Sequence, residues 1–265
     1  MHSHEPSPNF VIDRMKSGKV ALGIIVRVVR SGEIAMIARA TDHDFIFIDN
    51  QHSVFDQQTI SQMALVAIGC GVTPVVRVRA FDDPDIPRLL DAGVMGIVVP
   101  DVNTAEEAER AVSAAKFPPM GRRSIGGPSP VFCLRTVPAA TSMRVLNETT
   151  LVVCMIETRR AVGNLDSIAA VDGVDVLHIG CNDLLVDIGK PGEFECPEII
   201  EAISKVIAAG KAHGVQIGLG GDKNIERQKK WIEQGVRFVT TQSDIAMLSA
   251  EASRRTEELR KAVSP

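Results

Sequence analysis

Short apolar runs alternate with longer amphipathic segments along almost the whole chain. Each run is only a few residues long and nearly continuous in apolar side chains, which is typical of parallel strands covered on both faces. Eight such strands are expected, at Val20–Val28, Phe45–Asp49, Pro74–Val78, Gly96–Pro100, Leu151–Glu157, Val174–Gly180, Val215–Gly220 and Phe238–Gln242.

The segments between these runs have helical periodicity. The clearest helices are expected at Asp56–Ile68, Asp83–Asp91, Thr104–Ala115, Pro197–His213, Asn224–Gln234 and Asp244–Ala262. A Gly-Val pair stands just before or at several strands, where glycine accepts the left-handed conformation that ends a helix. Eight strands with intervening helices predict a single TIM (β/α)8 barrel over residues 11–265, with an open doubly wound sheet as the alternative.

Two segments do not follow this rhythm. Residues 1–10 are polar and contain proline, without the apolar stretch of a signal peptide, so we expect a flexible tail. The segment Phe117–Thr150 is rich in proline and glycine. A long insertion of this kind after a barrel strand usually carries function, and we expect it over the mouth of the barrel.

Composition narrows the possible functions. The 265 residues carry a net charge of −4 with no basic block, which argues against nucleic-acid binding. The apolar runs have the length of strands, so no membrane span is expected. Five cysteines, an odd number without a C-x-x-C pair, fit a reducing cytoplasm better than a disulfide framework or a zinc knuckle.

Polar residues gather where the expected strands end, and catalytic residues of such barrels lie at the C-terminal ends of strands. The residues at these positions are mostly acidic: Asp49 with His52 three residues later, Arg77, Asp101, Glu157 and Asp183.

Glu157 and Asp183 end adjacent strands. Two carboxylates that meet at a barrel mouth repel one another unless a proton or a cation lies between them. Hard oxygen ligands favour Mg²⁺ or Mn²⁺. The alternative is that each carboxylate forms an ion pair, for which Arg159 and Arg160 are close to Glu157 in sequence.

The other polar positions each allow two interpretations. His52 is either a general base oriented by Asp49 or a loop residue with an ordinary hydrogen bond. Arg77, within an apolar strand, needs a partner, which is either Asp49 or a substrate carboxylate or enolate. His178 lies in an apolar strand and is expected to be a hydrogen-bonded core histidine. No lysine lies in the eight strands, which disfavours a Schiff-base mechanism.

Six short stretches occur in the order and spacing of a known family. They are Ile-Asp-Asn-Gln-His (48–52), Pro-Val-Val-Arg-Val (74–78), Leu-Leu-Asp-Ala-Gly (89–93), Pro-Pro-Met-Gly-Arg-Arg (118–123), Met-Ile-Glu-Thr-Arg (155–159) and Ile-Gly-Cys-Asn-Asp-Leu (179–184). Together they resemble the HpcH/HpaI aldolases, class II pyruvate aldolases of the phosphoenolpyruvate/pyruvate-binding barrel superfamily.

The resemblance implies a divalent-metal enzyme, using Mg²⁺, Mn²⁺ or Co²⁺, that cleaves a 4-hydroxy-2-oxoacid into pyruvate and an aldehyde. It implies these roles: Glu157 and Asp183 as metal ligands, Arg77 at the enolate oxygen, His52 with Asp49 in proton transfer, the N–H groups of Gly180, Cys181 and Asn182 at the pyruvate carboxylate, and Asp91 reaching the histidine region from a neighbouring subunit. It also implies dimers grouped into hexamers, with exchanged C-terminal helices.

The sequence departs from the family at two positions. Gln51 replaces a common glutamate directly before His52, and Met155 replaces a common glutamine two residues before Glu157. The loop Ser124–Pro130 also differs and is expected to shape the aldehyde pocket. The alternatives to an aldolase are a related barrel lyase that decarboxylates oxaloacetate or cleaves another oxoacid, and a homologue that binds a 2-oxoacid without turnover.

Overall fold

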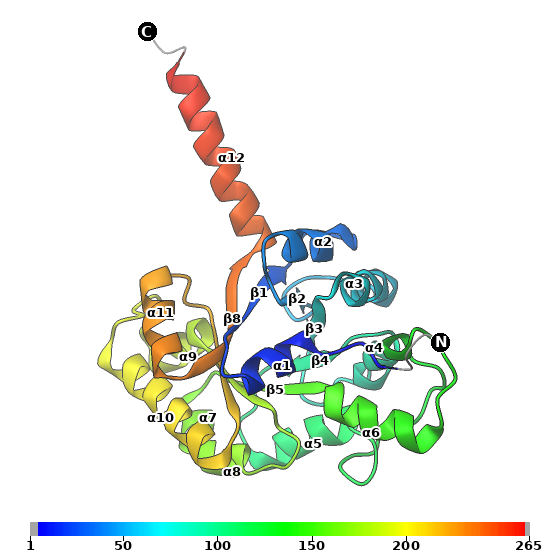
Figure 1. The fold of residues 1–265 in the computed structure, drawn as a ribbon. Helices are drawn as coiled ribbons and strands as arrows, with labels where there is room; N and C mark the ends of the chain where they lie inside the picture. The colour runs from blue at the N-terminus through cyan, green and yellow to red at the C-terminus, as the bar shows by residue number, and fades with distance from the viewer. Residues whose placement is uncertain (1–4, 263–265) are drawn as a thin grey trace.

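The computed structural model describes residues 5–262, in which eight parallel strands close into a barrel in sequence order (Figure 1). Closure through the β1–β8 pair confirms the predicted TIM barrel and excludes the open sheet. The strands are β1 Ala21–Val26, β2 Phe45–Asp49, β3 Thr73–Arg77, β4 Gly96–Val99, β5 Leu151–Ile156, β6 Val176–Gly180, β7 Gln216–Gly220 and β8 Val236–Ser243.

All six expected helices are present, with ends that differ by at most a few residues. Local signals fix several of them: Thr104 forms a capping box with Glu107 at the start of α5, and Gly71 ends α3 in the left-handed conformation. The helices are α1 Phe10–Lys16, α2 Glu33–Ala40, α3 Gln57–Cys70, α4 Ile86–Asp91, α5 Ala105–Ala115, α6 Ala139–Thr149, α7 Arg159–Gly163, α8 Leu165–Ala169, α9 Cys181–Ile188, α10 Pro197–His213, α11 Ile225–Gln234 and α12 Asp244–Lys261, with a 3₁₀ turn η1 at Pro130–Phe132.

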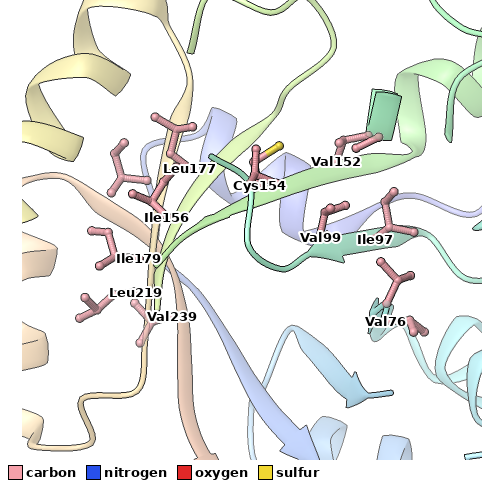
Figure 2. Close-up of a cluster of buried hydrophobic side chains, with 14 of the residues drawn as sticks. Val76, Ile97, Val99, Val152, Cys154, Ile156, Leu177, Ile179, Leu219 and Val239 are labelled. Atoms are coloured by element: carbon pink, nitrogen blue, oxygen red, sulfur yellow. The ribbon is translucent and has the colours of Figure 1, made fainter. Parts of the chain in front are cut away.

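The strands are buried on both faces because alternate side chains point into and out of the barrel. One cluster fills the barrel and includes Phe45 and Phe238, whose rings stack 4.3 Å apart. A larger cluster lies between the strands and the helices around them. Figure 2 shows part of this outer layer, with labels on Val76, Ile97, Val99, Val152, Cys154, Ile156, Leu177, Ile179, Leu219 and Val239.

Helix α1 closes the N-terminal end of the barrel. Its residues Val11 and Met15 belong to the inner cluster. The buried Asn9 donates from its amide to the carbonyl oxygens of Met95 (3.1 Å) and Thr149 (2.7 Å), just before β4 and β5. Residues 1–10 were expected to form a flexible tail. Asn9 is anchored by these hydrogen bonds. Residues 1–4 lie outside the described residues.

The insertion at residues 117–150 does not lie where we expected it. It contains α6, and Val131 accepts a hydrogen bond from the Ser7 N–H (2.8 Å) beside α1. Helix α5 leaves the C-terminal end of β4 and runs back along the barrel, so the segment after α5 starts at the opposite end from the mouth. The expectation that it covers the mouth is wrong within this chain.

Helix α12 extends away from the barrel (Figure 1). Its first residue is firmly held, because the buried Asp244 carboxylate accepts the backbone N–H groups of Arg27, Val28 and Val29 at 2.9–3.0 Å. The rest of the helix is exposed, including the apolar side chains of Ile245, Leu248 and Leu259. No described helix is long and apolar enough to cross a membrane.

His178 is a core residue, as expected, but not a hydrogen-bonded one. Its ring is buried inside the barrel, edge-on to Phe238 at 5.4 Å, and Nδ1 has no hydrogen-bond partner among residues 5–262. Burial lowers the pKa of His178 to about 3, with smaller contributions from Lys223 and Arg77. Space for the ring exists because β7 has glycine beside it: a Cβ at Gly218 would lie 2.4 Å from Nδ1.

Because the imidazole of His178 is buried, we expect the folding stability of the protein to fall in acid. Below pH 6.5 the unfolded chain protonates residue 178 while the folded protein does not, so folding stability falls as the pH drops from 6.5 towards 3. His178→Leu should reduce the slope of unfolding free energy against pH by about 1.4 kcal/mol per pH unit in this window. Urea unfolding from pH 6.5 to 5.0 measures it, with the exposed His213→Asn as control. Equal slopes in wild type and His178→Leu would contradict it.

Candidate active site

A pocket of about 360 Å³ opens at the C-terminal ends of the barrel strands. Most of the predicted site residues meet there. The lining residues are Ile25, Arg27, Phe47, Asp49, His52, Arg77, Met155, Glu157, His178, Gly180, Asn182, Asp183, Gly220, Gly221, Lys223, Thr240, Gln242 and Ser243.

Asp49 and Arg77 form the central ion pair of the pocket. Arg77 donates from Nε to Oδ1 (3.0 Å) and from Nη2 to Oδ2 (2.8 Å) of the fully buried carboxylate, and Arg27 approaches Oδ2 at 3.3 Å. Burial alone would raise the pKa of Asp49, but the hydrogen bonds and charge of Arg77 outweigh it and lower the pKa. Two partners were considered for Arg77, namely Asp49 and a substrate carboxylate or enolate. The structure shows the pair with Asp49.

His52 is oriented by Asp49 through the backbone and not through its ring. Its N–H donates to Asp49 Oδ1 (3.1 Å), and its carbonyl oxygen accepts from Arg27 Nη2 (3.3 Å). The side chain is exposed at the pocket mouth. The imidazole is therefore placed at the entrance, where a proton can be exchanged with ligand or solvent.

Glu157 is a buried carboxylate with one satisfied oxygen. Oε2 accepts the N–H of Asp101 (3.0 Å), whereas Oε1 has no partner among the described residues. Burial foremost, and then the charges of Asp183 and Asp101, raise the pKa of Glu157 to about 8. The ion pair considered with Arg159 is absent, because Arg159 pairs with Asp187 (3.2 Å).

These donors fit a divalent cation only as a partial ligand set. A free buried carboxylate oxygen beside a second carboxylate is what a hard cation requires. Within residues 5–262, however, no three His, Cys, Asp or Glu side chains are close enough to hold a metal by themselves. Glu157 and Asp183 would supply two positions, and the remaining ones would fall to water and to substrate oxygens.

The first turn of α9 forms another wall of the pocket. Gly180 and Asn182 line it, and Gly180 precedes the helix without a side-chain cap. Cys181 lies behind this wall, and burial raises the pKa of its thiol to about 12, so it stays protonated at neutral pH. The N-terminus of this helix has N–H groups without a side-chain cap, and such groups are suited to an anion.

Asp91 lies apart from this pocket. It ends α4, ahead of β4, and its carboxylate accepts from Arg123 Nη2 at 2.7 Å. None of residues 117–150 lines the pocket, so the loop Ser124–Pro130 does not shape it within one chain. The same loop lies against Asp91, since a Cβ at Gly126 would be 2.8 Å from Asp91 Oδ2.

Sequence reasoning missed two cations. Arg27 directly follows β1, but the strand was expected to continue to Val28, so Arg27 was not recognised as a polar residue at a strand end. Lys223 lines the pocket although no strand contains a lysine: it enters from the loop after β7. The eight strands contain no lysine, as expected, but a long side chain can reach the pocket from a loop, so lysine is still present in the pocket wall.

A family profile and the curated relatives that resemble this chain point to the same family. Residues 29–250 match the profile of the HpcH/HpaI aldolase/citrate lyase family. The chain is 36% identical over 252 residues to 4-hydroxy-4-methyl-2-oxoglutarate aldolase tasA of Hapsidospora irregularis, covering 92% of each chain. It is 39% identical over 217 residues to a hydroxypyruvate/pyruvate aldolase of Rhizorhabdus wittichii, covering 80% of this chain and 83% of the relative.

Solved structures with a similar fold include members of the same family. An HpcH/HpaI aldolase from Desulfitobacterium hafniense superposes with a TM-score of 0.91 at 29% identity, covering 97% of this chain and 98% of the other. The citrate synthase SbnG superposes with a TM-score of 0.85 at 26% identity, covering 94% and 97%. With the closed barrel and the pocket at its strand ends, the profile match and these relatives establish that the chain belongs to the HpcH/HpaI aldolase/citrate lyase family.

Proposed function

We propose that this pocket catalyses the reversible, divalent-metal-dependent cleavage of a 4-hydroxy-2-oxoacid into pyruvate and an aldehyde. The observation that carries the proposal is the buried Oε1 of Glu157, which has no partner among residues 5–262 and lies in the same pocket as Asp183 and the Asp49–Arg77 pair. The named aldolases among the relatives support an enzyme over a homologue that only binds.

Glu157 and Asp183 would hold the cation, as Mg²⁺, Mn²⁺ or Co²⁺. When bound, it would polarise the keto group and stabilise negative charge that develops on the keto oxygen. Arg77 is a second, fixed cation for that charge: Asp49 holds its guanidinium in one orientation, so little reorganisation is needed during reaction. The exposed His52 ring would move the proton at the hydroxyl end of the substrate.

The N–H groups at the start of α9, around Gly180, Cys181 and Asn182, would bind the carboxylate of the 2-oxoacid. The uncapped first turn supports this, because helix N-termini favour anions. The hydroxyl-bearing half of the substrate would then lie towards His52 and Arg27 at the mouth.

Assembly into dimers and dimer-based hexamers is part of the proposal. Ile245, Leu248 and Leu259 share one side of α12 at helical spacing and are 45%, 68% and 69% exposed. An apolar stripe on a helix that leaves its own barrel fits exchange onto a second copy. Asp91 would act in this assembly, reaching the His52 region of the neighbouring subunit.

We also propose a reducing, cytoplasmic location. All five cysteines, at positions 70, 133, 154, 181 and 196, are free thiols. Disulfides persist in oxidising compartments, whereas free and largely buried thiols are usual in reducing ones.

Metal removal tests the reaction. Excess chelator should abolish pyruvate formation from 4-hydroxy-2-oxoacids, and Mg²⁺, Mn²⁺ or Co²⁺ should restore it. Glu157→Gln should weaken Mn²⁺ binding, measured by calorimetry, and lower turnover by about 100-fold or more, because one ligand charge is lost. The exposed Glu148→Gln serves as control. Full activity in excess chelator would exclude the metal-dependent reaction.

Arg77→Ala tests the fixed cation. Its loss should lower kcat by about 10²–10³-fold, as for the removal of other groups that stabilise an oxyanion. Mn²⁺ affinity should change little, since Glu157 and Asp183 remain. Steady-state kinetics with circular dichroism measure both points, and the exposed Arg88→Ala is the matched control. Near-normal kcat in Arg77→Ala would remove this residue from the chemistry.

Light scattering tests assembly. We expect the wild-type protein to be larger than the 28.5 kDa monomer. Leu248→Glu combined with Leu259→Glu should reduce the mass, because charges on the apolar stripe oppose its burial. The polar change Glu257→Gln on the same helix should leave the mass unaltered. A monomeric wild type, or an unchanged assembly in the double variant, would contradict the exchange of α12.

A further inference from the structure

Lys223 reaches the pocket wall from the loop between β7 and α11. Its Nζ donates to the carbonyl oxygen (2.9 Å) and to Oγ1 (3.1 Å) of Thr240 in β8. An ammonium group has three N–H donors. Two are used to fix the position of Nζ, and one remains available to the pocket.

This ammonium group has no carboxylate partner in the part of the chain that the structure describes. Within residues 5–262, Lys223 Nζ forms no ion pair with an Asp or Glu carboxylate. The adjacent Asp222 is occupied elsewhere, because it accepts from Arg227 Nε (2.7 Å) and Nη2 (2.9 Å). A cation withdrawn from water without a counter-charge is costly, and burial lowers the pKa of Lys223 to about 8.

Two glycines at the end of β7 bring this lysine loop against the first turn of α9. A Cβ at Gly221, where φ is +87°, would lie 2.9 Å from the backbone N of Asn182. A Cβ at Gly220 would lie 2.6 Å from His178 Nε2 and 3.2 Å from Thr240 Oγ1. The ammonium group, the imidazole and the N–H groups of α9 therefore surround one side of the pocket.

The other charged groups of the pocket have a partner in the structure or in the proposed function. Asp49 pairs with Arg77 and Arg27. Glu157 and Asp183 would hold the divalent cation. Lys223 is left as the cation whose partner must come from the ligand. A 2-oxoacid carries one permanent negative charge, its carboxylate, which stays ionised throughout aldol cleavage.

We propose that Lys223 is a binding residue for the carboxylate of the 2-oxoacid. It acts together with the N–H groups at the start of α9 and restricts the enzyme to oxoacids against neutral 2-oxo compounds. This assignment rests on the proposed function for the identity of the ligand. Because the carboxylate has the same charge in substrate and transition state, Lys223 lowers KM more than it raises kcat.

Binding of pyruvate and of its neutral analogue pyruvamide to the Mn²⁺-loaded protein tests the assignment. In Lys223→Met, calorimetry should give a pyruvate Kd at least about tenfold higher, since a charge-assisted hydrogen bond is lost, and a pyruvamide Kd within about twofold of wild type. Lys223→Arg should retain most of the affinity for pyruvate. Lys229→Met, an exposed lysine of α11, should leave both Kd values unchanged.

Three results would overturn the assignment. One is an unchanged pyruvate Kd in Lys223→Met, and another is an equal loss of affinity for pyruvate and pyruvamide. The third is covalent trapping of pyruvate on Lys223 by borohydride, detected by peptide mass, since that would make the residue an imine-forming amine. The binding comparison does not depend on turnover, so failure of the proposed reaction and failure of this assignment are distinguishable.

Discussion

The carboxylate of Asp49 is enclosed at the end of β2, with the guanidinium of Arg77 bonded to both of its oxygens and Arg27 beside it. Removing either charge alone would leave the other in a poorly solvated site, which costs folding free energy. The same carboxylate accepts the N–H of His52. One buried anion thereby sets the direction of Arg77 and the path of the loop that carries the histidine.

The carboxylates of the pocket differ in pKa and in role because their surroundings differ. Asp49 is compensated by arginine and its pKa is lowered, whereas burial without a cationic partner raises the pKa of Glu157 to about 8. Asp101 donates its backbone N–H to Glu157, while its own negative charge adds to the rise in the pKa of Glu157. Acids that look alike in the sequence are thus divided into a structural anion, a candidate ligand and a backbone donor.

The barrel could be predicted because parallel strands and helices leave a periodic record in sequence, and so could the ends of the strands that carry Asp49, Arg77 and Glu157. The sequence does not predict whether Asp49 binds the ring or the backbone N–H of His52, because both groups lie within reach of its carboxylate. Lys223 and the position of residues 117–150 were missed for a related reason. The position of a flexible side chain or of an irregular segment is not encoded in a periodic sequence pattern.

The bare backbone of β7 has a consequence for how this pocket can diversify. Gly218 and Gly220 leave room that the ring of His178 fills from the neighbouring strand. A side chain at either glycine would collide with this ring, so it calls for a smaller residue at position 178. These positions form a unit that evolution or engineering must alter jointly, and the depth of the pocket can therefore change in discrete steps while its rim of charged groups stays the same.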